Sequence, residues 1–131
     1  MAIYPTPEQI AALLAGPDDA PVVMLNVLRF KPRADGPDEG ASGEEAYMRY
    51  ADAMREIVES SGGRFVWMGR VESVVIGDDG ARFDVVGLVE YPSRRKFVEI
   101  ATSDRVRDIG VHRTAGLESQ WLIATTEMRL P

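Results

Sequence analysis

The order of the elements predicted after residue 20 constrains this chain more than any other feature: strand, helix, strand, tight turn, strand, helix, strand. The first strand is predicted at residues 22–30, because a continuous apolar run of this kind (VVMLNVLRF) is typical of a central strand buried on both faces. The predicted order consists of two strand–helix–strand halves joined by a hairpin. This arrangement is the split βαβ unit, which has one antiparallel sheet and both helices on one face. The sequence therefore predicts an α+β, ferredoxin-like fold.

Local signals predict the bounds of the other elements. Capping boxes begin a short N-terminal helix at residues 6–15 and the main amphipathic helix at residues 42–61. Residues 31–42 have no periodicity and are expected to form either a lid or an ordinary surface loop. The whole chain, residues 1–131, is expected to be one domain with its core at about residues 20–128. The remaining predicted elements are strands at residues 64–76 and 82–91 around a Gly77-Asp78-Asp79-Gly80 hairpin, a helix from Pro92-Ser93 to Thr102, a further helical turn or two after Asp104, and a strand at residues 121–128.

Alternation in the two central strands predicts which residues share a face. The side under the helices is expected to be uniformly apolar and to hold Val23, Leu25, Val27, Phe83, Val85 and Val89. The opposite side is then formed by Met24, Asn26, Leu28, Phe30, Asp84, Val86, Leu88 and Glu90. This second set is too apolar to face water over a whole sheet, because exposed apolar patches of more than a few hundred Å² usually mark interfaces. The expected partner is a second copy of the chain, in a homodimer packed sheet against sheet.

Composition narrows the range of partners. A net charge of -6 disfavours nucleic acid, because affinity for the phosphate backbone depends on Lys and Arg. Zero cysteines exclude disulfides and thiolate metal sites, and a single histidine cannot build a multi-histidine metal site. No apolar run approaches the ~20 residues that span a bilayer, and no signal-peptide pattern is present. The expectation is a cytoplasmic protein with no metal, no nucleic-acid partner and no membrane partner.

Five residues are candidates for binding a substrate. Asn26 is polar in mid-strand, so its amide either orients a substrate oxygen or makes a structural hydrogen bond; leaving it unpaired would cost about 1–3 kcal/mol. Tyr50 and Trp67 supply amphipathic surface for a pocket, with a role in the core as the alternative. Arg29 and Arg113 offer planar guanidinium groups that fit an anionic substrate group, with surface ion pairs as the alternative.

Two residues are candidates for catalytic proton transfer. His112 is the only side chain that titrates near neutral pH without perturbation; in the connection before the last strand, it would otherwise be a surface or capping residue. Glu90 would serve as a general base if burial raised its pKa, and a solvated ion pair is the alternative. Asp84 and Glu90 are too far apart to act as a carboxylate pair, since they lie about 20 Å apart along a strand.

Several motifs give the chain a resemblance to a known family. They are LNVLRFKP at residues 25–32, YMRY at 47–50, SGGRFVWMG at 61–69, DVVGLVEYPS at 84–93 and HRTAGL at 112–117. In this order they resemble the DUF1330 family, which belongs to the dimeric α+β barrel superfamily. The resemblance implies a ferredoxin-like fold and a barrel built by two chains. Superfamily relatives include cofactor-independent monooxygenases, haem-dependent and haem-degrading enzymes, lactone isomerases and polyketide cyclases, so the fold does not select a reaction.

These observations lead to one functional expectation with alternatives. A small organic molecule is expected to bind in a cleft between the helices, the sheet and the loop at residues 31–42. If the protein is an enzyme, it needs no cofactor: Asn26 and Tyr50 would polarise an oxygen while His112 or a carboxylate moves a proton. The alternative is a non-catalytic binding or assembly protein. Haem binding through His112 lacks a visible second ligand, and a nucleotide cofactor lacks a glycine-rich phosphate loop.

Overall fold

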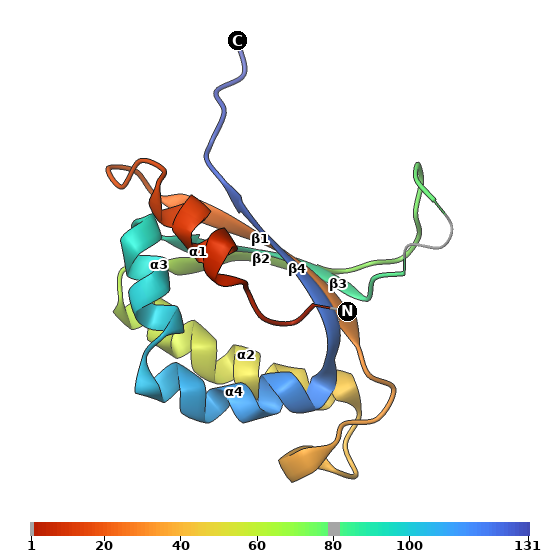
Figure 1. The fold of residues 1–131 in the computed structure, drawn as a ribbon. Helices are drawn as coiled ribbons and strands as arrows, with labels where there is room; N and C mark the ends of the chain where they lie inside the picture. Colours follow the sequence, from red (N-terminus) through yellow and green to blue (C-terminus); the bar gives the residue numbers. More distant parts are fainter. Residues whose placement is uncertain (1, 79–81) are drawn as a thin grey trace.

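The computed structural model describes residues 2–78 and 82–131 and shows one antiparallel sheet with helices along one face (Figure 1). The strands lie in the order β2-β3-β1-β4, and each neighbouring pair is antiparallel. The predicted ferredoxin-like α+β fold is therefore confirmed. In chain order the elements are α1 (Pro7–Leu14), β1 (Val22–Phe30), the 3₁₀ turn η1 (Gly36–Asp38), α2 (Gly43–Ser60), β2 (Arg64–Arg70), β3 (Val85–Tyr91), α3 (Arg94–Ala101), α4 (Asp104–Gly116) and β4 (Leu117–Thr125).

Side-chain caps begin the α-helices. Thr6 and Ser42 each complete a capping box, in which the hydroxyl accepts a backbone N–H bond and a side chain three residues on returns one. The hydroxyls of Ser93 and Ser103 accept backbone N–H bonds in the same way at the starts of α3 and α4. These caps explain why α1 and α2 begin where the sequence predicts. None of the helices that the structure describes is long and apolar enough to cross a membrane.

The faces predicted for β1 are wrong, whereas those predicted for β3 are right. Met24 lies opposite Val89, and both are buried beneath the helices. Because β1 is apolar on both sides, alternation alone could not assign its faces, and the register with β3 decides them. The helix side of β1 holds Met24, Asn26, Leu28 and Phe30, all predicted to face outward. The outer face of the two central strands, free of any described helix (Figure 1), holds Val23, Leu25, Val27, Val86, Leu88 and Glu90.

Strand β2 is shorter than predicted. It ends at Arg70 instead of Ile76, and the pairing with the next strand closes with a 2.9 Å bond from the Val71 N–H to the Asp84 carbonyl. Beyond that bond, residues 71–78 leave the sheet, and the side chain of Val75 is 90% exposed. The alternating apolar residues that predicted a longer strand therefore have no strand to pair with. The hairpin predicted at residues 77–80 lies partly outside the described residues.

The segment before the last strand is a complete helix, not a connection with a turn or two. Helix α4 runs to Gly116, and β4 follows directly from Leu117, ahead of the predicted start at Trp121. His112 and Arg113 therefore lie on a helix, which corrects the predicted position of His112. The pattern of α4 was hard to read because only Val106 and the last two residues of the helix are buried.

Two glycines let α2 and α4 approach each other closely. Gly43 begins α2 and Gly116 ends α4, and a Cβ on either residue would collide with backbone oxygen atoms. The N–H of Lys31 donates to the carbonyl of Gly116 at 2.8 Å, which ties the end of β1 to the same point. The helices thus meet the sheet at this end. The two largest core clusters between sheet and helices include Val22, Met24, Leu28, Met54, Val58, Val89 and Leu117.

Candidate functional site

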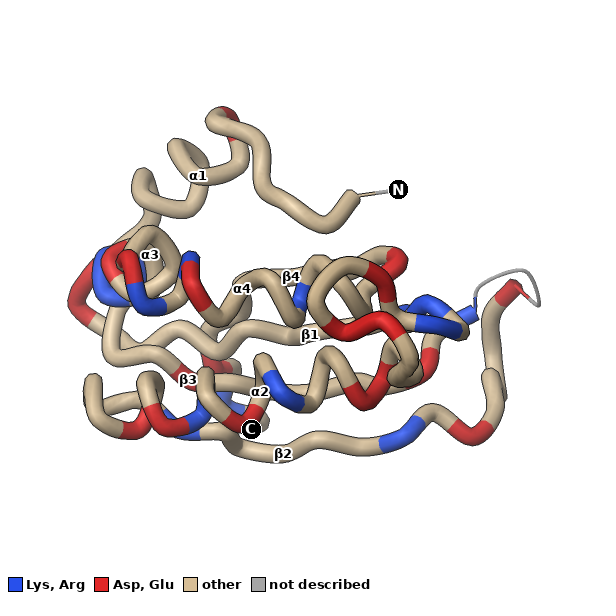
Figure 2. Tube along the Cα trace, turned by 90° about the horizontal axis from the view of Figure 1, so that it is seen from below, with Lys and Arg blue, Asp and Glu red and all other residues tan. Residues whose placement is uncertain are grey.

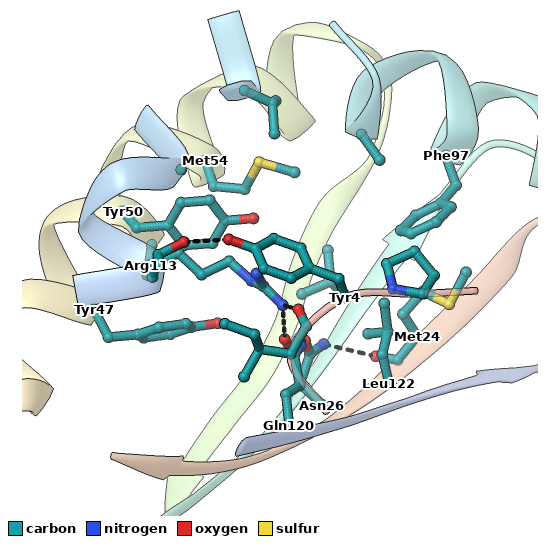
Figure 3. A pocket seen from close by; sticks show the side chains of 18 of the residues that line it. Tyr4, Met24, Asn26, Tyr47, Tyr50, Met54, Phe97, Arg113, Gln120 and Leu122 are labelled. Carbon is teal, nitrogen blue, oxygen red and sulfur yellow. Dashed lines mark hydrogen bonds between the residues drawn. The ribbon is translucent and has the colours of Figure 1, made fainter. Parts of the chain in front are cut away.

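A cavity of about 1560 Å³ lies between the inner face of the sheet and the helices (Figure 3). Residues from α1, α2, α3 and α4 line it, together with the N-terminal segment at residues 2–5. The volume exceeds the roughly 300–1,000 Å³ of typical small-molecule sites, so a bulky organic molecule would fit. The loop at residues 31–42 contributes Asp35, Gly36 and Pro37 to the lining.

Most of the cavity lining is apolar. Met24 comes from the sheet, Met54 from α2 and Phe97 from α3, and their side chains surround the same space (Figure 3). The N-terminal segment and α1 add almost no charge, because Glu8 is the only charged residue between residues 2 and 15 (Figure 2). The cavity therefore suits a ligand with a largely apolar body.

A chain of hydrogen bonds crosses the cavity, and we call its members Arg113, Gln120 and Asn26 the amide relay (Figure 3). Arg113 Nη2 donates to Gln120 Oε1 at 2.7 Å, and Gln120 Nε2 donates to Asn26 Oδ1 at 2.9 Å. Asn26 Nδ2 in turn donates to the Met24 carbonyl at 3.2 Å. Asn26 thus makes structural hydrogen bonds. Through Gln120, these bonds fix the orientation of the Arg113 guanidinium.

Arg113 is held by neutral partners only. Its Nη2 also donates to the Ile3 carbonyl, and its guanidinium carbon lies 5.3 Å from the centre of the Tyr4 ring. The Tyr4 hydroxyl is 2.6 Å from Thr114 Oγ1, which fixes the N-terminal segment beside the guanidinium. Across residues 2–78 and 82–131, no carboxylate forms a salt bridge with Arg113. The cavity therefore contains a cation that the described part of the chain does not neutralise.

Three buried or half-buried tyrosines line the cavity: Tyr47, Tyr50 and Tyr91. None of their hydroxyls has a hydrogen-bond partner among the described residues. No fully enclosed side-chain oxygen or nitrogen in that part of the chain lacks a partner, so the three hydroxyls keep some contact with solvent. Burial raises the pKa of each phenol, and the charge of Arg113 opposes this for Tyr47 and Tyr50. The hydroxyls stay protonated at neutral pH and can donate hydrogen bonds.

His112 belongs to a different group, which we call the Asp38 cluster. His112 Nδ1 lies 2.7 Å from Oδ2 of Asp38, a residue only 2% exposed, and Arg49 of α2 bonds the other carboxylate oxygen. The hydrogen bond with His112 holds the pKa of Asp38 below its ordinary value, and Arg49 adds to this effect. His112 does not line the cavity. The cluster instead binds the loop at residues 31–42 to α2 and α4.

The other predicted site residues lie on the outer face of the sheet. Glu90 pairs with Arg64 at 3.1 Å, Arg29 pairs with Glu118 at 3.4 Å, and the side chain of Trp67 is 57% exposed. The sheet separates all three from the cavity. Of the predicted residues, the structure brings together Asn26, Tyr50 and Arg113, and it places His112, Glu90, Arg29 and Trp67 elsewhere.

Sequence reasoning missed three contributors to the cavity: Gln120, Tyr4 and Tyr91. Gln120 preceded the predicted start of the last strand, so its side chain had no assigned face. An earlier strand start would have placed it near Asn26. Tyr4 precedes the first helix, and no local signal indicates that this segment crosses the cavity. Tyr91 ends a predicted strand, and the alternation of that strand could have assigned it to the helix side.

Comparison with known proteins identifies the family. The family model described as Domain of unknown function (DUF1330) matches residues 41–126, which is more than half of the chain. The chain belongs to the DUF1330 family. A protein of unknown function from Rhodopseudomonas palustris, whose crystal structure is known, is 37% identical over 98% of each chain, with a TM-score of 0.89. This similarity extends well beyond residues 41–126.

More distant structures share only the fold of this DUF1330 protein. A dabb family protein with a ferredoxin-like fold from Mesorhizobium loti is 11% identical over 83% of this chain and 98% of its own, with a TM-score of 0.55. The hydroxynitrile lyase from Passiflora edulis is 9% identical over 86% of this chain and 99% of its own, with a TM-score of 0.61. No curated protein matches the chain. Membership of DUF1330 therefore specifies a fold but no reaction.

Proposed function

We propose that this DUF1330 protein binds a bulky, largely apolar organic molecule with at least one oxygen acceptor. The observation that carries the proposal is the set of tyrosine hydroxyls that face an apolar cavity without a partner among the described residues. A ligand that displaced water from these hydroxyls without accepting a hydrogen bond would pay roughly 1–3 kcal/mol for each. An oxygen atom on the bound molecule would accept these bonds and avoid that cost.

The same geometry favours binding without turnover over acid–base catalysis. Neither His112 nor Glu90 lines the cavity, and burial raises the pKa of the tyrosine hydroxyls further from neutrality. Asp35 lines the cavity, but its Oδ2 accepts a hydrogen bond from Lys31 Nζ at 2.7 Å. The described lining thus offers hydrogen-bond donors for a ligand and no group well placed to exchange a proton near neutral pH.

Titration with prodan, an uncharged naphthalene dye with a ketone oxygen, tests this proposal. We expect saturable binding with a blue-shifted emission. Gly87→Leu should weaken binding about tenfold, because an added Cβ at this lining residue meets its nearest atoms at an ordinary 3.6 Å and the rest of the side chain enters the cavity. Val86→Leu adds bulk to the other face of the same strand and is the matched control. Absence of saturable binding, or equal binding by Gly87→Leu, would contradict the proposal.

We also propose that two copies of the chain associate through the outer face of the sheet. The central strands present an apolar surface there, and the side chains of Trp67 and Trp121 on the flanking strands are 57% and 62% exposed. Among the described residues, charged side chains on this face pair within the chain, as Glu90 does with Arg64. A neutral apolar surface of this kind suits an identical surface better than a charged partner.

Two segments that project from the sheet also favour a second copy of the chain as the partner. Residues 71–78 and the C-terminal residues 126–131 extend from the sheet on the side opposite α2 and α4 (Figure 1). Their apolar side chains are largely exposed, including Ile76 at 95% and Leu130 at 88%. A second sheet docked on the outer face would lie between these segments and could cover them.

Light scattering and tryptophan fluorescence test the association together. The chain has two tryptophans, and both side chains belong to the outer face, so their emission reports on that surface. We expect a dimer with blue-shifted emission. Leu88→Lys should give a monomer with red-shifted emission, because burying an unpaired charge is costly. Met48→Lys, at an exposed position of α2, is the control. A wild-type monomer at micromolar concentration would contradict the proposal.

A further inference from the structure

We infer that the molecule bound in the cavity is an organic anion whose charged end contacts Arg113. The charged group would be a carboxylate or a chemically similar oxyanion. This inference rests on the proposed function and adds the charge of the ligand to it. Three observations support it: the charges that line the cavity, the way in which Arg113 is held, and the hydrogen-bond donors around it.

Four charged residues line the cavity, and they differ in their partners. Asp35 bonds Lys31, and Arg107 pairs with Asp104 at 3.3 Å. Arg94 donates to carbonyl oxygens at the C-terminal end of α1, where the helix dipole favours a cation. Arg113 lies in the last turn of α4, where the helix dipole also favours a cation, but it has no carboxylate partner among the described residues. An anion is therefore the ligand charge that this cavity would stabilise most.

Hydrogen bonds occupy one nitrogen of the Arg113 guanidinium and leave the N–H groups of the other two available. Nη2 donates to the Ile3 carbonyl and to Gln120 Oε1. A guanidinium carries five N–H groups, and those on Nε and Nη1 have no acceptor in the described part of the chain. Both guanidinium forks that can hold the two oxygens of a carboxylate include Nη2, so neither fork is vacant here. The N–H groups on Nε and Nη1 remain as single donors to an oxyanion, and the relay holds the guanidinium in a fixed orientation.

The hydroxyls of Tyr47 and Tyr50 add hydrogen-bond donors to the N–H groups of Arg113. Both tyrosines project from α2 toward the space that Arg113 enters from α4 (Figure 3). Arg113 lines the same cavity as both tyrosines, and its charge opposes the rise that burial causes in the pKa of each phenol. Neutral hydroxyl donors beside a guanidinium stabilise an oxyanion and offer little to a neutral hydrocarbon.

The cavity lining away from Arg113 indicates the size and polarity of the uncharged part of the ligand. Away from Arg113, the lining includes Met24, Leu13 and Phe97, and methionine side chains adapt to irregular apolar shapes. The cavity volume of about 1560 Å³ leaves room for a body much larger than the charged group itself. The ligand class is therefore an amphiphilic organic anion with one oxyanion end and a bulky apolar remainder.

A matched pair of dyes tests the inference. Anilinonaphthalene sulfonate is an amphiphilic anion, and N-phenylnaphthylamine is the same aromatic body without the charge. We expect the wild-type protein to prefer the sulfonate by about tenfold, in line with hydrogen bonds to a charged group. Arg113→Gln should remove this preference, whereas Arg113→Lys should retain part of it because the charge remains. The Gly87→Leu variant should weaken binding of both dyes, which locates them in the cavity.

Arg107→Gln is the control, because it removes another arginine of α4 that lines the cavity but already pairs with Asp104. Its preference for the sulfonate should equal that of the wild type. If prodan binds but the two naphthalene dyes bind equally, or if Arg113→Gln keeps the preference, the inference fails while the proposed function stands. If prodan and both dyes fail to bind saturably, the proposed function fails, and the inference fails with it.

Discussion

His112 and Arg113 are adjacent on α4 but belong to different groups. The Asp38 cluster of His112 contains opposite charges, whereas the amide relay of Arg113 contains no carboxylate. Successive residues of a helix point about 100° apart, so His112 meets the loop at residues 31–42 and Arg113 enters the cavity. In the Asp38 cluster, the buried carboxylate finds both His112 and Arg49 within the chain. In the amide relay, the guanidinium has only neutral oxygens as partners.

The comparison shows when a partly buried charge indicates a ligand. A charge whose counter-charge lies in the same chain already has its stabilisation, as Asp38 does, and needs nothing from outside. A charge held in place without a counter-charge, as Arg113 is, becomes stabilised when an anion arrives. The first group is therefore expected to affect stability and the second to affect binding.

The largest effect on stability is expected from Asp38→Ala. This change leaves Arg49 and His112 without their common partner and releases the loop at residues 31–42 from α2 and α4. The melting temperature should fall more than for any other substitution considered. Asp104→Ala, which removes an exposed carboxylate paired with Arg107, should change it little. Equal melting temperatures for these two variants would mean that the Asp38 cluster is not structural.

The Asp38 cluster should also affect how the melting temperature changes with pH in acid. The folded pKa of Asp38 lies below its ordinary value of 3.8, so ionised Asp38 stabilises the folded state. This contribution is fully present above the unfolded pKa and is lost as the pH falls through the lower folded pKa. Thermal melts should therefore show wild type more stable than Asp38→Asn at about pH 5, with the two converging in stronger acid. A difference that persists unchanged into strong acid would contradict this assignment.

Asn26→Ala should lower both the melting temperature and the preference for the sulfonate dye, each by an intermediate amount. Gln120 Nε2 loses its acceptor, and one part-buried neutral hydrogen bond contributes about 1 kcal/mol to the free energy of unfolding. The melting temperature should fall by a few degrees. The preference for the sulfonate dye should also weaken, by less than in Arg113→Gln, because the guanidinium loses orientation but keeps its charge. An unchanged dye preference would show that the relay does not position Arg113.

The smallest effect on stability is expected from Tyr50→Phe. The hydroxyl has no partner among the described residues, so its removal should change the free energy of unfolding by no more than about 0.5 kcal/mol. Affinity for the sulfonate dye should nevertheless fall, since one donor to the oxyanion is lost. A drop of several degrees in melting temperature with unchanged dye affinity would instead identify the hydroxyl as structural.

The overall fold was predictable because its signals are local. The capping residues Thr6 and Ser42 mark helix starts, and the apolar run of β1 identifies a central strand without knowledge of its neighbours. The faces of β1 were not predictable in this way. Met24 and Val23 are equally apolar, and only the pairing with β3 decides which of them lies under the helices.

The candidate site was predictable only in part, for the same physical reason. Asn26, Tyr50 and Arg113 were recognisable as polar or aromatic residues in strategic places, and the structure brings them to one cavity. That Asn26 acts through Gln120 depends on the position of β4 beside β1. The role of His112 depended on Asp38, which lies far away in the sequence within a loop that has no periodic pattern.

Nuclear magnetic resonance of the arginine side chains tests the central claim most directly. The Nε–H resonance of Arg113, assigned by comparison with Arg113→Lys, can be followed while dodecanoate or dodecanol is added to the protein labelled with nitrogen-15. Dodecanoate should shift this resonance saturably and more than that of Arg49, whose partner Asp38 is already in place, and dodecanol should not. An Arg113 resonance that stays in place at saturating dodecanoate would contradict the account.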